Sequence, residues 1–275
     1  MPHRRIEKSL RGCGVYVMNK MLFAFVSLAA IAVATPALSA TSIGNVGSIA
    51  GTDGSITAPP LGSTYSYVST YEGVVGAGQI ASVGGTSGSE YITDAFSADA
   101  GDSLDFYFNY ITSDGSGFAD YAFAELLDGA NAHVAYLFTA RTQPSGNTSP
   151  GFGLPANSAT LIPATSAIVS GTTFSPLGGS SGDCYNAGCG HTGWIESQYA
   201  IGTTGSYKLR LGVTNWSDAA YDSALAFAGV TVDGEVIDTP DTPGVPEPVS
   251  WALMLAGFGL VGSAMRSHRN RVRFA

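Results

Sequence analysis

The chain has 275 residues, of which 12% are charged, and its formal net charge at pH 7 is −9. Between Thr41 and Val245 only three basic residues stand against 19 acidic ones, which gives −16, because the two ends carry most of the positive charge. So acidic a segment argues against nucleic acid or anionic lipid as a partner.

Residues 1–40 are interpreted as a leader and signal peptide. Leu22–Ala34 is an apolar stretch of 13 residues that follows Lys20, and small residues continue to Ala40. This build is typical of a secretory signal peptide, with cleavage expected near Ser39 or Ala40. Residues 1–17 are either an extended basic n-region or a gene-calling artefact upstream of a start at Met18 or Met21.

Residues 41–238 are expected to form one all-β domain. Apolar and polar side chains alternate over 104–110 and 207–213, which predicts strands with one buried face. Segments 120–127 and 133–140 flank Asp128-Gly129-Ala130-Asn131 and predict a hairpin.

A last strand is predicted at 224–232. Its alternation places Ala224, Ala226, Ala228, Val230 and Val232 on one face, and Leu225 and Phe227 on the other. Short strands separated by Gly, Pro and Asn turns favour an antiparallel β-sandwich of jelly-roll type. The stretch 142–182 is rich in Pro, Gly and Ser, and is expected to be a long excursion that could cover one sheet.

Two cysteines lie in the exported part, in the sequence Asp183-Cys184-Tyr185-Asn186-Ala187-Gly188-Cys189. An even number in an oxidising compartment predicts a disulfide between Cys184 and Cys189, worth roughly 2 kcal/mol by loop-closure entropy. The alternative is a metal site made by both cysteines and His191. It lacks a fourth ligand and the usual C-x-x-C spacing.

Residues 178–182 match the pattern G-x-S-x-G around Ser180. A nucleophile elbow needs a strand before the serine and a helix after it, whereas here glycines precede it and the cysteine loop follows. His133 and His191 are the histidines available as a base, and His133 falls in a strand pattern. The match is interpreted as compositional.

Four aspartates could hold Ca²⁺. Asp114, Asp120, Asp218 and Asp222 lie in loops at predicted strand borders, where carboxylate and carbonyl oxygens can converge. No D-x-D-x-D-G pattern is present, and turn-forming or strand-capping Asp is the competing interpretation. The sequence predicts no cofactor other than this Ca²⁺.

Glycan chemistry has further candidates. A glycosidase needs two facing carboxylates, for which Glu125 and Glu196 are conceivable. Trp194 and Trp216, with nearby tyrosines, could stack on sugar rings or equally well pack in the core.

The C-terminal part has three features. Residues 239–248 are a Pro-rich linker, Val249–Met265 is a run of 17 uncharged residues, and a basic terminus follows. As a helix that run would be about 25 Å long, at the short end of what crosses a membrane. The arginines should hold the terminus in the cytoplasm, so 249–275 is predicted to be a transmembrane helix with a basic tail. A buried core helix is the alternative.

This tail resembles the PEP-CTERM sorting signal in its PEPxxWA form. The resemblance is carried by Pro246, Glu247, Pro248, Trp251, Ala252, Gly257, Gly259, Arg266 and Arg269. It implies processing by an exosortase-type membrane enzyme of a Gram-negative bacterium that makes extracellular polysaccharide. Ser267, His268 and Asn270 interrupt the basic run, where the family has a more continuous one.

The central domain resembles exported PEP-CTERM proteins of unassigned function. The matching segments are 112–117, 120–122, 138–142, the cysteine loop with Gly193-Trp194, and 222–230. Segment 222–230 is also similar to the closing strand of carbohydrate-binding jelly rolls. That likeness implies a fold and no catalytic residue.

The sequence therefore predicts an exported, non-catalytic protein of the cell envelope or extracellular matrix, structural or glycan-adhesive. Its expected partners are the exosortase-type enzyme and exopolysaccharide, and its precursor is held in the inner membrane by the C-terminal helix. The alternative is a secreted glycan-active hydrolase, which two facing carboxylates or a bond between Ser180 and His191 would favour.

Overall fold

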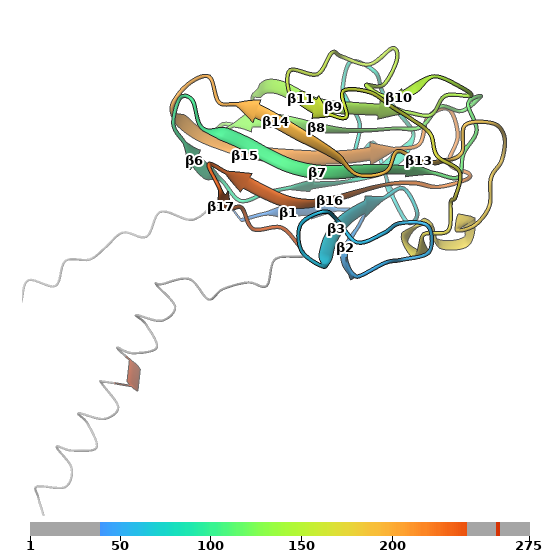
Figure 1. Ribbon diagram of the computed structural model, residues 1–275, viewed down its shortest axis with the longest axis horizontal. Helices are drawn as coiled ribbons and strands as arrows, with labels where there is room; N and C mark the ends of the chain where they lie inside the picture. Colours follow the sequence, from blue (N-terminus) through green and yellow to red (C-terminus); the bar gives the residue numbers. More distant parts are fainter. Residues whose placement is uncertain (1–38, 241–256, 259–275) are drawn as a thin grey trace, which may run out of the picture. The chain divides into compact units, whose positions relative to one another are not determined.

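The computed structural model describes residues 39–240 and 257–258. Two antiparallel sheets pack face to face, which confirms the prediction of an all-β, antiparallel β-sandwich (Figure 1). The predicted signal peptide before residue 39 lies outside the described residues, as do the sorting-signal positions other than Gly257. Among the residues described, no helix is long and apolar enough to cross a membrane.

The first sheet, here called sheet A, has the strand order β1-β5-β15-β8-β9, with β4 paired to β5 and β6 to β15. Its strands are β1 (Thr41–Ile43), β4 (Val74–Val75), β5 (Ser87–Ile92), β6 (Phe96–Ala98), β8 (Tyr121–Asp128), β9 (His133–Arg141) and β15 (Gly205–Thr214). The predicted hairpin is β8–β9, and Oδ1 of Asp128 accepts the N–H groups of Ala130 and Ala132 within its turn.

Sheet B has the order β11-β14-β7-β16-β3-β2, with β13 paired to β7 and β17 to β16. Its strands are β2 (Asn45–Ala50), β3 (Thr64–Ser69), β7 (Ser103–Thr112), β11 (Thr160–Ile162), β13 (Gly190–His191), β14 (Ile195–Ala200), β16 (Ser223–Val232) and β17 (Glu235–Val236).

The excursion 142–182 is mostly irregular, as predicted, but it covers both sheets. It holds β10 (Asn147–Ser149), β11, β12 (Ser166–Ala167) and a 3₁₀ helix, η1 (Ser175–Ser180). Leu154 packs on Tyr121 and Phe123 at the outer face of sheet A. Phe174 and Leu177 are fully buried on the outer face of sheet B.

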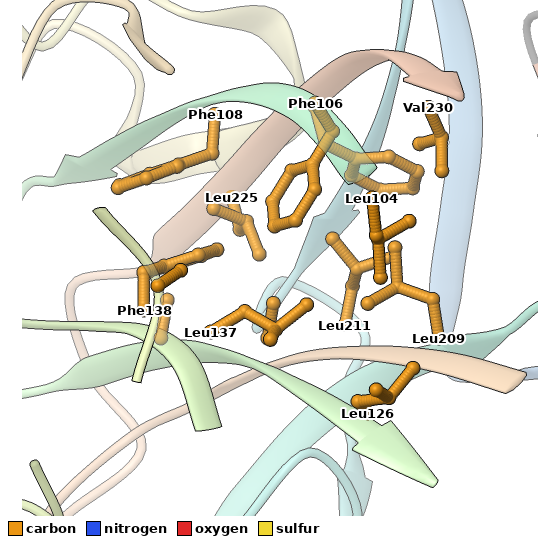
Figure 2. Close-up of a cluster of buried hydrophobic side chains, with 14 of the residues drawn as sticks. Leu104, Phe106, Phe108, Leu126, Leu137, Phe138, Leu209, Leu211, Leu225 and Val230 are labelled. Carbon is orange, nitrogen blue, oxygen red and sulfur yellow. The ribbon is translucent and has the colours of Figure 1, made fainter. Parts of the chain in front are cut away.

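The main core lies between the sheets, where β7 meets β8, β9 and β15 (Figure 2). Phe106 and Phe108 of β7 face Leu209 and Leu211 of β15, and all four are fully buried. The rings of Phe108 and Phe138 stack with centroids 3.6 Å apart. Burying each side chain of this size stabilises the fold by about 1.5–3 kcal/mol, so the period-two pattern decides which faces meet.

The prediction of which side chains share a face is wrong at the end of β16. Ala224, Ala226 and Ala228 do share the outer face of sheet B, but Val230 and Val232 lie in the main core with Leu225 and Phe227. The pairing of β16 with β7 shifts between Ala228 and Thr231, and Gly229 has a φ of 64°. The extra residue of this bulge reverses the alternation, which period-two counting cannot detect.

Candidate functional site

Two loops cross from one sheet to the other at the same end of the sandwich. Residues 113–120, the β7–β8 arch, pass from sheet B to sheet A, and residues 215–222, the β15–β16 arch, pass back. The strand register places Thr112 opposite Ser223 and Tyr121 opposite Thr214, so the two arches lie side by side.

Asp120 ties the two arches together. Its Oδ2 accepts the hydroxyl of Ser223 at 2.7 Å, and its Oδ1 accepts the N–H of Trp216 at 2.8 Å. The side chain is fully buried, and burial raises its pKa well above the ordinary value, although the hydrogen bond from Ser223 opposes this. Because both carboxylate oxygens are engaged, the role of Asp120 is to position the arches.

Asp114 has a carboxylate oxygen without a partner. The residue is 1% exposed, its Oδ1 accepts the N–H of Gly115 at 2.7 Å, and its Oδ2 is buried with no hydrogen bond. Burial, with a smaller contribution from the charge of Asp218, raises the pKa of Asp114 to about 6. Buried acceptors are almost always satisfied, which makes this oxygen a candidate for binding a ligand.

Asp114 lines a small pocket of about 90 Å³, the arch pocket, which is bounded by Asp114, Phe118, Tyr185, Asp218, Ala220 and Tyr221. The ring of Tyr185 lies 5.3 Å from that of Phe118 and 5.1 Å from that of Tyr221, measured between centroids. Tyr185 is half exposed. The pocket therefore combines an aromatic rim with two carboxylates.

The disulfide predicted between Cys184 and Cys189 is confirmed, and it closes the loop that carries Tyr185. This disulfide loop (184–189) is docked on the β7–β8 arch by two backbone hydrogen bonds, Tyr185 N–H to Ser113 C=O and Ser116 N–H to Ala187 C=O, both 3.0 Å. A Cβ on Gly115 would lie 2.5 Å from Cβ of Asn186, so the close approach requires glycine there.

Strained backbone gathers around the arch pocket. Ala119, Ser217 and Tyr221 have φ values of 43°, 73° and 58°, in the left-handed region that side chains with a Cβ rarely adopt. Each such residue costs roughly 1–3 kcal/mol and persists where surrounding contacts hold it, often at functional sites. Tyr221 has this strained conformation and also places its ring against that of Tyr185.

The four aspartates predicted to bind Ca²⁺ lie at the arch end of the sandwich but in different settings. Asp114 and Asp218 line the arch pocket together, and Asp120 lies behind them with both oxygens engaged. Asp222 lies apart, accepting hydrogen bonds from Thr70 and Ser180, both 3.0 Å. Within the described ranges, no three His, Cys, Asp or Glu side chains are grouped so that they could hold a metal ion.

The other catalytic candidates are dispersed. The hydroxyl of Ser180 donates to Asp222, and Nδ1 of His191 accepts the N–H of Gly193 at 3.1 Å. Glu125 lies on β8 of sheet A and Glu196 on β14 of sheet B, each on an outer face.

Both tryptophans are half-buried and contact other residues of the sandwich. Nε1–H of Trp194 donates to Thr57 C=O at 3.0 Å, and its ring packs edge-on against Tyr65. Trp216 lies beneath the guanidinium of Arg141, whose Cζ is 4.7 Å from the ring centroid. The aromatic rim of the arch pocket, which the sequence analysis did not identify, comes from Phe118, Tyr185 and Tyr221 instead.

A charged network that was also missed crosses the outer face of sheet A. Arg210 lies between Glu90 and Glu125, with its NH1 3.0 Å from Oε2 of Glu125, and Oε1 of Glu125 is 2.7 Å from Nδ1 of His133. The two glutamate side chains are about nine-tenths buried. Alternation places these residues on one face, but only the strand order brings them into contact.

Searches against protein-family models, curated proteins and solved structures found no match to this chain.

Proposed function

We propose that this protein is an exported, non-catalytic β-sandwich of jelly-roll-like type that binds glycan in the cell envelope or extracellular matrix. The observation that carries the proposal is the arch pocket, which is lined by Asp114, whose Oδ2 is unpartnered, and by a rim of Phe118, Tyr185 and Tyr221. The sequence also allows a purely structural role without a ligand. Such a role would not explain why Oδ2 of Asp114 is buried without a partner.

The chemistry of a sugar suits these groups. A sugar ring presents an apolar C–H face, which packs on aromatic rings, and a hydroxyl edge, which donates to buried acceptors. The rings around Tyr185 can pack on the apolar face of the sugar, and Asp114 can accept a hydrogen bond from its hydroxyl edge. A pocket of about 90 Å³ admits one edge of a sugar unit.

The two ends of the sequence support delivery outside the cytoplasm. The apolar stretch 22–34 is proposed to start export, and the PEPxxWA-type tail to hold the precursor in the inner membrane until an exosortase-type enzyme processes it. The Cys184–Cys189 disulfide agrees with an oxidising compartment.

The test is binding of the full chain, purified from the envelope of a Gram-negative host, to exopolysaccharide from that host. Tyr185→Ala is expected to weaken binding about fivefold or more, because it removes the central ring of the rim. Phe152→Ala is the matched control, since Phe152 is exposed to a similar degree but lies outside the pocket.

Unchanged binding by Tyr185→Ala would contradict the assignment of the pocket. Shortening of the polymer during incubation would contradict the non-catalytic role and favour the secreted glycan-active hydrolase.

A further inference from the structure

The arch pocket concentrates negative charge without a compensating cation. Asp114 and Asp218 are its two charged lining residues, and none of its lining side chains is basic. The basic residues of the domain are engaged elsewhere: Arg210 with Glu90 and Glu125, Lys208 with Asn131, and Arg141 over Trp216.

The unpartnered Oδ2 of Asp114 is an observation independent of this clustering. It is a fully buried acceptor on a residue that lines the pocket, and the N–H of the neighbouring Gly115 donates to Oδ1 instead. Asp218 is held in place by its own loop, since its Oδ1 accepts the N–H of Ala220 at 3.0 Å.

We propose that the arch pocket binds a divalent cation, with Ca²⁺ as the best fit, through Oδ2 of Asp114 and the carboxylate of Asp218. This inference rests on the proposed function, because it makes the cation the polar half of the glycan site. Two carboxylates balance the charge of one divalent ion, whereas a sugar hydroxyl alone satisfies the acceptor without neutralising the charge.

The small number of protein ligands determines which divalent cation fits the site and how tightly it binds. Ca²⁺ takes six to eight oxygens in flexible geometry, while Mg²⁺ requires a near-ideal octahedron. With two carboxylates from the protein, the remaining positions belong to water and to neighbouring hydroxyls of the sugar. Such a site is weak when empty of glycan, in the range of about 10⁻⁴–10⁻³ M that extracellular modules show.

The aromatic rim provides a direct assay on the full chain. Tyr185 and Tyr221 line the pocket, so their ultraviolet absorption should sensitise the luminescence of bound Tb³⁺, which uses the same oxygen ligands as Ca²⁺. We expect sensitised emission that Ca²⁺ displaces, and a loss of affinity of about tenfold or more in Asp114→Asn and in Asp218→Asn, as expected when ligand charge is removed.

Asp94→Asn is the matched control, because Asp94 is exposed and lies outside the pocket. Equal Tb³⁺ affinity in Asp114→Asn and the parent chain would overturn the proposal, as would emission that Ca²⁺ does not displace. Folding of Asp114→Asn is checked separately by its thermal unfolding in EDTA, where removal of a buried charge should not lower Tm.

The cation and glycan proposals fail in distinguishable ways. If the chain shows no Tb³⁺ emission but still binds glycan in EDTA, the proposed cation site is wrong and the proposed glycan site is supported. If Ca²⁺ displaces bound Tb³⁺ but the chain binds no exopolysaccharide, the proposed cation site is supported and the proposed glycan binding is wrong.

Discussion

The rings of Tyr185 and Tyr221 lie 5.1 Å apart, although one belongs to the disulfide loop and the other to the β15–β16 arch. Their contact closes the rim of the arch pocket over Asp114 and Asp218. The geometry of the pocket therefore depends on how firmly the disulfide loop is docked, which several substitutions can measure.

Gly115→Ala is expected to displace the disulfide loop, because the new Cβ would lie 2.5 Å from Cβ of Asn186. We expect a loss of about 1–3 kcal/mol in the free energy of unfolding, typical of overpacking, together with weaker glycan binding. Gly117→Ala in the same arch is the control, since its Cβ would meet no atom within 4 Å. Equal effects of the two substitutions in denaturant titrations would refute the docking argument.

Replacing both Cys184 and Cys189 with serine should lower the free energy of unfolding by about 2 kcal/mol, as expected for so short a closed loop. Glycan affinity should fall as well, because Tyr185 would no longer be held against Phe118. Urea unfolding and polysaccharide binding measure the two effects. Full affinity in the double variant would show that hydrogen bonds alone hold the rim.

Asp114 should make the stability of the metal-free protein fall as pH rises from about 4 to about 6. Its folded pKa of about 6 exceeds its ordinary value of 3.8, so in this window the folded state retains a proton that the unfolded state has lost. The decrease attributable to this group is at most about 3 kcal/mol.

Comparing the parent chain with Asp114→Asn in EDTA measures that contribution together with the part of the raised pKa of Asp120 that the charge of Asp114 causes, while the raised pKa of Asp222 acts in both proteins. Urea unfolding at several pH values should give a flatter profile for the variant. Parallel profiles would mean that Asp114 is solvated.

Arg210→Met should destabilise the sandwich by about 3–5 kcal/mol, because it leaves Glu90 and Glu125 buried without their shared counter-charge. Lys208→Met, two residues away on β15, is the control, since Lys208 bonds the neutral Asn131. Adding Glu90→Gln and Glu125→Gln to Arg210→Met should recover part of the loss. A similar cost for the arginine and lysine variants would contradict the role of the network.

Deleting residues 249–275 is expected to release a folded domain to the periplasm. The described strands end at Val236, so the deletion removes no part of the sandwich core. Cell fractionation and circular dichroism compare the truncated chain with the full chain. Loss of soluble folded material would contradict the interpretation of the tail as a sorting signal alone.

The long strands could be predicted because burial of one face imposes a visible period of two. Residues 104–110 and 207–213 show this alternation without interruption, and they lie in β7 and β15. The strands before residue 100 are shorter and rich in Gly, Ser and Thr, so their pattern is weak. The bulge at Gly229 adds one residue, and no property of the sequence marks it apart from the glycine itself.

The acidic residues of the arch pocket could be predicted from the sequence, but its aromatic rim could not. Asp114 and Asp218 attract notice as acidic loop residues, but their meeting depends on which loops share one end of the sandwich. Phe118, Tyr185 and Tyr221 come from three separate loops, and each alone resembles an ordinary loop aromatic. The strand order, with β7 beside β16 and β15 beside β8, brings the two arches together, and hydrogen bonds to the β7–β8 arch add the disulfide loop.

Strand β16 also connects the arch end of the sandwich with its opposite end. It begins at Ser223 beside the arches and runs ten residues, about 33 Å, toward the other end of the sandwich, where β17 follows. Strand β17 turns back along β16, and the N–H of Ile237 donates to Val230 C=O. The arch pocket and the β16–β17 hairpin thus lie at opposite ends of the sandwich, about the length of one strand apart.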